Sequence, residues 1–253
     1  MIKFRDYQEN IISKGVKYLN DNKFVYLSME VRTGKTLTAL GILDKMTNVN
    51  RALFITKKKA ISSIESDFDL LKPEIELTVI NYESLHKIDL KGWDAVVCDE
   101  SHSMGAFPKP SKRAKQVKDL IMKNNPFVIL LSGTPTPESF SQIYHQIYGI
   151  ASNPFRSYTN FYKFAKDYVV PNTRRIGGFM VNDYSQGKDS ILTVMKPYMI
   201  SYTQKEAGFE SVIEEEVIYI EPPELILRLC NKLKKDLVWK ERKMLYWQTQ
   251  VLN

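Results

Sequence analysis

The stretch FVYLSMEVRTGKT, residues 24–36, decides the fold of this chain. Its first part, FVYLS, is a short apolar run typical of a strand buried on both faces. MEVRTGKT then leads into a segment with helical spacing at Leu37, Leu40 and Leu43. A strand, a loop ending in GKT and a helix form the arrangement that a phosphate-binding loop requires. The alternative is a GKT that stands at the start of a helix by chance.

Each residue of the predicted loop has a chemical reason to be there. Backbone amides before a helix N-terminus cradle phosphates, and Gly34 lets the chain approach them closely. Lys35 would reach the β and γ phosphates, Thr36 would ligate Mg, and Arg32 and Thr33 complete the loop. The full pattern GxxxxGK[ST] has a glycine five residues before Gly34, and this chain has Met29 there.

A second apolar run, DAVVC at 94–98, ends in the two acids Asp99 and Glu100. Carboxylates at the carboxyl end of such a strand lie where the phosphate loop would also lie. Asp99 would hold the Mg ion, directly or through water, and Glu100 would orient and deprotonate the water that attacks the γ phosphate. A pair of acids can also simply cap a strand or the helix that follows.

Further apolar runs at 52–55, 77–80 and 127–131 alternate with helical segments through residue 150. This order predicts an α/β fold, a parallel sheet with helices on both faces, over residues 1–150. Residues 151–215 are aromatic and basic, and we expect a mostly helical accessory part of the same lobe. Residues 216–253 would form a hinge and a long helix, which could be the start of a second lobe. This segment has an apolar stripe followed by two tryptophans: Leu225, Leu229, Leu233, Leu237, Trp239 and Trp247.

The composition is that of a globular protein with a basic balance. Hydrophobic residues make up 43% of the 253 positions, and 36 Lys and Arg against 29 Asp and Glu give a net charge of +7. The charge favours a polyanionic partner, although a basic surface without a partner explains it equally well. Cys98 and Cys230 have no metal-binding spacing and indicate reduced thiols. Without a signal-like or membrane-length apolar stretch, we expect a cytoplasmic protein that does not enter a membrane.

MEVRTGKT, DESH at 99–102 and LSGTP at 131–135 resemble motifs one, two and three of superfamily two helicases, in the same order. FRDYQENII at 4–12, INYESL at 80–85 and MKPYMISYTQKEAGF at 195–209 are similar to segments of the Swi/Snf-like DNA translocases, including small ones of bacteriophages. The resemblance covers nearly the whole chain. It implies a RecA-like lobe of a phosphate-loop NTPase that binds ATP and Mg in the cytoplasm of a bacterial or phage-infected cell.

The resemblance also implies roles for individual residues. Gln8, with Tyr7 or Arg5, would read the adenine, because a side-chain amide can form two hydrogen bonds to it. His102 would couple the nucleotide site to the nucleic acid track.

Two more sets of residues take their roles from the resemblance. Ser132 and Thr134 would relay the nucleotide state, although SGTP is also a plausible plain turn. Thr56, Lys57, Lys58 and Lys59 would meet the phosphate backbone of nucleic acid, or else form a solvated run of charge.

The chain departs from the family in two places. Ser201 and Tyr202 stand where Swi/Snf-like proteins usually carry a basic pair. The second RecA-like lobe, with its arginine finger, is also missing, so we expect an ATP hydrolase that needs another lobe for efficient turnover. Duplex DNA is the partner we favour. A nucleotide- or DNA-binding module without efficient turnover and an RNA helicase lobe remain as alternatives.

Overall fold

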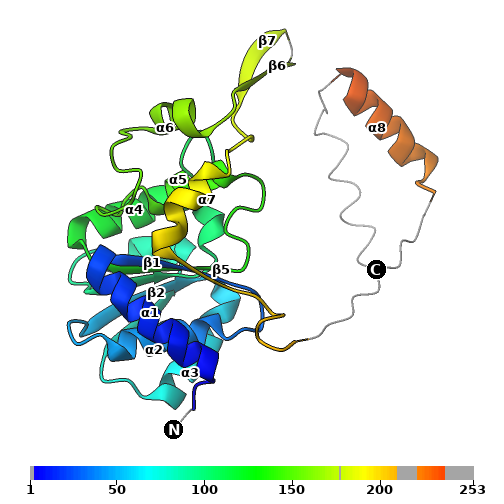
Figure 1. Cartoon of the computed structure of the whole chain (residues 1–253). Helices are drawn as coiled ribbons and strands as arrows, with labels where there is room; N and C mark the ends of the chain where they lie inside the picture. The colour runs from blue at the N-terminus through cyan, green and yellow to red at the C-terminus, as the bar shows by residue number, and fades with distance from the viewer. Residues whose placement is uncertain (1–2, 177, 210–220, 237–253) are drawn as a thin grey trace. The chain divides into compact units, whose positions relative to one another are not determined.

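The computed structural model describes residues 3–176, 178–209 and 221–236. Its centre is a six-stranded sheet in the order β3-β2-β4-β5-β1-β8, in which every neighbouring pair is parallel. Figure 1 shows the sheet between one group of helices that includes α1, α2 and α3 and another that includes α4, α5 and α7. The predicted α/β fold with a parallel sheet is confirmed. The strands are β1 Phe24–Met29, β2 Arg51–Thr56, β3 Glu76–Asn81, β4 Ala95–Cys98, β5 Phe127–Ser132 and β8 Met199–Tyr202.

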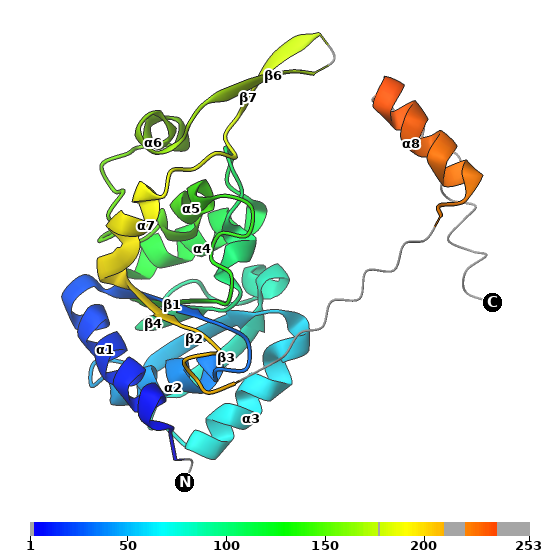
Figure 2. The same cartoon turned by 45° about the vertical axis from the view of Figure 1, so that its right-hand side comes forward.

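Alternating side chains of the strands build two cores, one on each face of the sheet. Val25, Leu27 and Met29 of β1 pack with α1 (Asp6–Asn22), α2 (Lys35–Lys45) and α3 (Ile61–Leu71). Phe24 and Tyr26 of the same strand pack on the other face. That face carries α4 (Lys112–Asn124), α5 (Ile143–Ile147) and α7 (Ser190–Met195), and α6 (Phe161–Tyr168) lies farther from the sheet, against α5, as Figure 2 shows. The strands are apolar on both sides because both faces are covered.

Short 3₁₀ helices follow several strands and place polar residues at the carboxyl edge of the sheet. The element η1 (Lys58–Ala60) follows β2, η2 (Tyr82–Lys87) follows β3, and η3 (Ser101–Met104) follows β4. Two further turns, η4 (Phe140–Gln142) and η5 (Lys196–Tyr198), lead into α5 and β8. Since parallel strands end at the same edge, the loops after β1, β4 and β5 lie near one another.

In the region 151–215, which we expected to be mostly helical, the structure has the helices α6 and α7 and also three strands. β6 (Asn172–Ile176) and β7 (Phe179–Asp183) form a hairpin, in which Gly178 at φ 88° permits the tight turn. Met199–Tyr202 joins the central sheet as β8, beside β1. The apolar spacing of α7 continues past residue 195, but Pro197 cannot supply a helical N–H and the helix ends.

By its contacts the chain divides into two units: residues 1–174 with 182–210, and residues 175–181 with 211–253. In the second unit, α8 (Glu224–Asp236) matches the helix expected after Pro223. Its side chains Leu225 and Leu233 are exposed, whereas Leu237, Trp239 and Trp247 of the predicted apolar cluster lie outside the described residues. None of the helices in the described ranges has the length and apolar character that crossing a membrane requires.

Candidate nucleotide site

The predicted phosphate loop connects the end of β1 at Met29 to the start of α2 at Lys35. Gly34 has φ 77°, a left-handed conformation, and a Cβ there would lie 2.4 Å from the side-chain nitrogen of Gln8. The left-handed backbone favours glycine at this point, and any larger side chain would also displace the end of the Gln8 side chain. Met29, where the full pattern has a glycine, is a fully buried strand residue paired with Tyr202. The departure from the pattern thus falls in the strand, outside the turn itself.

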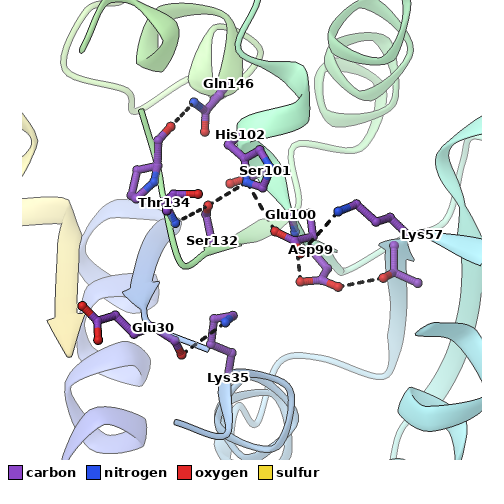
Figure 3. Close-up of polar contacts among 12 residues, drawn as sticks. Glu30, Lys35, Lys57, Asp99, Glu100, Ser101, His102, Ser132, Thr134 and Gln146 are labelled. Carbon is purple, nitrogen blue, oxygen red and sulfur yellow. Dashed lines mark hydrogen bonds and ion pairs between the residues drawn. The ribbon is translucent and has the colours of Figure 1, made fainter. Parts of the chain in front are cut away.

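Lys35 projects from the first turn of α2 toward the carboxyl edge of the sheet. Its Nζ donates a hydrogen bond to the carbonyl oxygen of Glu30 at 3.3 Å, which closes the loop on itself. Partial burial lowers the pKa of Lys35, and the charges of Glu100 and Asp99 oppose that shift. The opposing effect means that the ammonium group lies within electrostatic range of both acids. Figure 3 shows Lys35 and these two carboxylates in one region, although Lys35 begins α2 and both acids follow β4.

Asp99, the first acid after β4, is held by its neighbours in a fixed orientation. Thr56 Oγ1 donates to Asp99 Oδ2 at 2.7 Å, and the backbone N–H of Glu100 donates to Oδ1 at 2.9 Å. The hydroxyl of Tyr82 donates to the Asp99 carbonyl at 2.7 Å. Burial raises the pKa of Asp99, while the Thr56 hydrogen bond lowers it. Each carboxylate oxygen still has a lone pair available for a cation or water.

Glu100 lies in a left-handed backbone conformation, φ 49°, that turns its side chain toward two basic groups. Its Oε1 is 3.5 Å from Lys57 Nζ, and its Oε2 is 3.3 Å from His102 Nδ1. The same His102 nitrogen is 2.9 Å from Ser132 Oγ, which also accepts the backbone N–H of Thr134 at 3.1 Å. The predicted coupling residues therefore form one chain of contacts with the acidic box (Figure 3).

A second, fully buried network ties the acidic box to the sheet and to α5. Ser101 Oγ donates to the hydroxyl of Tyr26 at 2.7 Å, and that hydroxyl donates to Gln146 Oε1 at 2.7 Å. Gln146 Nε2 donates to the carbonyl of Pro135 at 2.8 Å. Burial raises the pKa of Tyr26 far above its usual range, so its hydroxyl stays protonated and able to donate. Sequence reasoning missed Tyr26 and Gln146, because each belongs to an ordinary strand or helix pattern.

Gln8 and Tyr7, predicted to read adenine, both contact the phosphate loop in the structure. Gln8 is buried, and its Oε1 accepts the backbone N–H of Arg5 at 3.0 Å, which leaves Nε2 facing Gly34. The hydroxyl of Tyr7 donates to the Thr33 carbonyl at 3.1 Å. Thr33 is fully buried and its own hydroxyl donates to the Glu30 carbonyl, while Arg32 is exposed. Any role of Gln8 in base recognition therefore goes together with support of the loop.

The end of β8 and the segment that follows it form hydrogen bonds with the phosphate loop. The backbone N–H of Glu30 donates to the Tyr202 carbonyl at 3.0 Å, and Glu30 Oε2 accepts the backbone N–H of Gln204 at 2.7 Å. Gln204 Nε2 donates to the Val31 carbonyl at 2.9 Å. The ring of Tyr202 stacks on Tyr7 with centroids 4.6 Å apart. Nothing in the sequence pattern indicated Glu30 or Gln204, because these residues are 174 positions apart and meet only in the folded chain.

Of the four residues expected to meet nucleic acid, Thr56 does not fit that role. It is fully buried and its hydroxyl is committed to Asp99, because β2 and β4 are neighbours in the sheet. Lys57 is exposed and paired with Glu100. Lys58 and Lys59 are exposed in η1 and form no ion pair with any residue of the described ranges.

The residues at this edge fit a magnesium–nucleotide complex. No group of three or more acidic, histidine or cysteine side chains able to hold a metal occurs among the described residues. Asp99 and the hydroxyl of Thr36 remain the two groups of the chain that we expect to hold the ion. Mg²⁺ is commonly bound in this way, with phosphate oxygens and water as the remaining ligands.

Comparison with known proteins gives a consistent result. A family model described as the SNF2-related domain matches residues 50–231, and one described as Type III restriction enzyme, res subunit, matches residues 1–69. The Sulfolobus solfataricus SWI2/SNF2 ATPase core domain is similar in structure, with a TM-score of 0.61 and 16% identity over 81% of this chain and 44% of that one. The Pyrococcus furiosus Hef helicase domain is matched at 0.46 and 18% identity, over 59% of this chain and 37% of that one. No curated protein sequence matches the chain.

The chain thus spans less than half the length of these two solved structures. The similarity in fold confirms the predicted RecA-like sheet, and the family matches confirm the resemblance to a first lobe of a superfamily two helicase. The SNF2-related model covers most of the residues, including the acidic box and the SGTP turn. The chain therefore belongs to the SNF2-related domain family.

Proposed function

We propose that the chain binds MgATP between the phosphate loop and the acidic box and hydrolyses it as one lobe of a duplex-DNA-dependent ATPase. One observation carries the proposal. Lys35 and Glu100 follow β1 and β4, and Ser132 is the last residue of β5; these three strands are adjacent in the sheet, and their carboxyl ends meet at one edge. Lys35 lies within electrostatic range of both acids, and Glu100 is linked to Ser132 through His102.

In this proposal each group of the chain has a distinct task. The bound nucleotide supplies the γ phosphate and the metal ion. Lys35 leaves the Glu30 carbonyl and binds phosphate oxygens, a stronger charge-assisted contact. Asp99, oriented by Thr56, holds the metal ion, and Glu100 accepts a proton from the attacking water.

Glu100 also offers a means of regulation by nucleic acid. Both of its oxygens contact basic groups, Lys57 and His102, in the unliganded chain. Contact of Lys57 with a DNA phosphate would release one of these oxygens, which could then accept a hydrogen bond from the attacking water. Nucleic acid would thereby favour turnover, while a second lobe would supply an arginine finger, which contributes roughly 10³–10⁵ in rate in related enzymes.

The same contacts support a second candidate, a nucleotide-binding module with little turnover. If the Glu100 contacts persist when DNA is bound, the chain holds MgATP without activating water. Steady-state ATP hydrolysis measured without nucleic acid, and with single-stranded DNA, duplex DNA or RNA, separates the two. Stimulation that is largest with duplex DNA supports the first proposal. Equal rates in all four conditions would reject it, and stimulation by RNA alone would indicate an RNA helicase lobe.

A further inference from the structure

Away from the nucleotide site, three cavities join into one groove along α4 and α5. Two have volumes of about 470 Å³ each and the third about 200 Å³. The first two share Lys118, Tyr148 and Thr159, and the second shares Ile150 and Arg156 with the third. We call this continuous depression, bounded by α4, α5 and residues 108–110 and 149–162, the α4–α5 groove. The volumes of the two larger cavities are in the range of ligand-binding pockets.

The groove is strongly basic. Its walls carry five cations against one carboxylate, a balance of +4: Lys23, Lys109, Lys115, Lys118 and Arg156 against Asp119. Across the described ranges none of these five cations is paired with a carboxylate, in contrast to Lys57 at the nucleotide site. Like charges gathered around a concave surface create a field that attracts an anionic ligand. A single phosphate would not neutralise so many charges over three cavities, whereas a chain of phosphates would.

Aromatic rings lie among these cations. The ammonium of Lys118 is 4.6 Å from the centroid of the Tyr148 ring. Phe161 and His145 stack at the floor, with centroids 5.6 Å apart, and the neighbouring Tyr162 is 49% exposed at the rim. Rings beside cations are the combination that binds single-stranded nucleic acid, since unpaired bases can stack on rings while the backbone meets the charges. The bases of an intact duplex are stacked on one another and cannot do this.

The groove is also connected to the nucleotide site through α5. His145, which lines the first cavity, is 2.9 Å from the carbonyl of Pro108 on the segment that follows η3. Its neighbour Gln146 belongs to the buried network with Tyr26 and, through it, Ser101 of the acidic box. A ligand that shifts α5 would therefore act on that network directly.

From this combination we propose that the α4–α5 groove is a second nucleic-acid-binding surface, which takes a single-stranded segment with its phosphates on the basic walls and a base against Tyr162. It is separate in residues from the lysines of η1 and does not depend on ATP hydrolysis. The proposal covers DNA and RNA strands alike, since both offer the same phosphates and unpaired bases.

The test uses the full chain and fluorescence anisotropy with a labelled single strand of about 15 nucleotides, DNA or RNA, over a salt series. The triple variant Lys115→Ala/Lys118→Ala/Arg156→Ala should lower the slope of log affinity against log salt by up to about 2, since each lost contact contributes about 0.7 on single strands. The matched control Lys14→Ala/Lys17→Ala/Lys45→Ala removes the same charge from the exposed surface of α1 and α2. It should leave the slope unchanged.

A second pair of variants tests stacking. Tyr162→Ala should weaken single-strand binding by about fivefold or more, whereas Tyr162→Phe, which keeps the ring, should bind as the unmodified chain does. An unchanged slope in the groove triple, or an equal loss in the control triple, would overturn the proposal. A second result would overturn the single-stranded part of the proposal: the groove triple reduces the salt slope, Tyr162→Ala leaves the affinity unchanged, and duplex binds as tightly as a single strand. The groove would then contact only the phosphate backbone. MgATP affinity, measured alongside, should be the same in all these variants and in the unmodified chain. If the unmodified chain did not bind MgATP, that result would count against the proposed function and not against the groove.

Discussion

The buried network around Tyr26 gives a quantitative prediction for the variant Tyr26→Phe. The hydroxyl of Tyr26 accepts from Ser101 and donates to Gln146, each at 2.7 Å, and the side chain is fully buried. Removing it leaves a buried donor and a buried acceptor without that partner, at about 1–3 kcal/mol each. Gln146 keeps its bonds through Nε2, so we take the lower part of the range and expect a loss of about 2–4 kcal/mol in the free energy of unfolding.

Urea denaturation followed by circular dichroism measures this loss. With a slope of about 2–3 kcal/mol per molar urea, the midpoint should fall by about 1 M. The control is Tyr18→Phe on α1, because the Tyr18 hydroxyl makes no hydrogen bond within the part of the chain that the structure describes; it should change stability by less than about 0.5 kcal/mol. If Tyr26→Phe destabilised the chain no more than the control does, the network would not hold the acidic box against α5.

Three further predictions concern the surroundings of the site. Gln204→Ala removes a side-chain hydrogen bond to the phosphate loop. It should weaken MgATP binding severalfold, measured by titration calorimetry, with little change in thermal stability; an unchanged affinity would mean that the segment after β8 does not support the site. Hydrogen bonds from Asn81 and then Arg113 lower the pKa of Glu83 to about 2 from 4.5, so their stabilising effect is complete above about pH 4.5 and is lost as the pH falls toward 2. The melting temperature of Glu83→Gln should therefore be lower than that of the unmodified chain at pH 7 and equal to it near pH 2. A difference in melting temperature that persisted at pH 2 would contradict this. Replacing Lys57–Lys59 with alanine should reduce the salt slope of duplex DNA binding by up to about 3, and an unreduced slope would remove η1 from the interface.

The parts of the site that sequence analysis located are those with a local signature. GKT between a strand and a helix, and two acids after an apolar run, depend on a few consecutive residues, and the structure brings Lys35, Asp99 and Glu100 to one edge. The alternation of strand and helix likewise defined the parallel sheet through β5.

What escaped prediction depends on contacts between distant segments. β8 is only four residues long, and its pairing with β1 cannot be inferred from its own pattern. Gln204 therefore could not be placed beside Glu30. Thr56 looked like part of a basic loop, but as the last residue of β2 it faces Asp99 at the end of the neighbouring β4.

The central claim is that Lys35 binds the nucleotide while Glu100 activates water. The measurement that tests it most directly is MgATP affinity by titration calorimetry together with duplex-stimulated hydrolysis, for the unmodified chain, Lys35→Ala and Glu100→Gln. We expect Lys35→Ala to lose affinity severely, because it removes the cation that the loop places against the phosphates. Glu100→Gln should keep its affinity and lose hydrolysis, since an amide can bind water but cannot accept its proton. Unchanged affinity in Lys35→Ala, or unchanged hydrolysis in Glu100→Gln, would contradict the account.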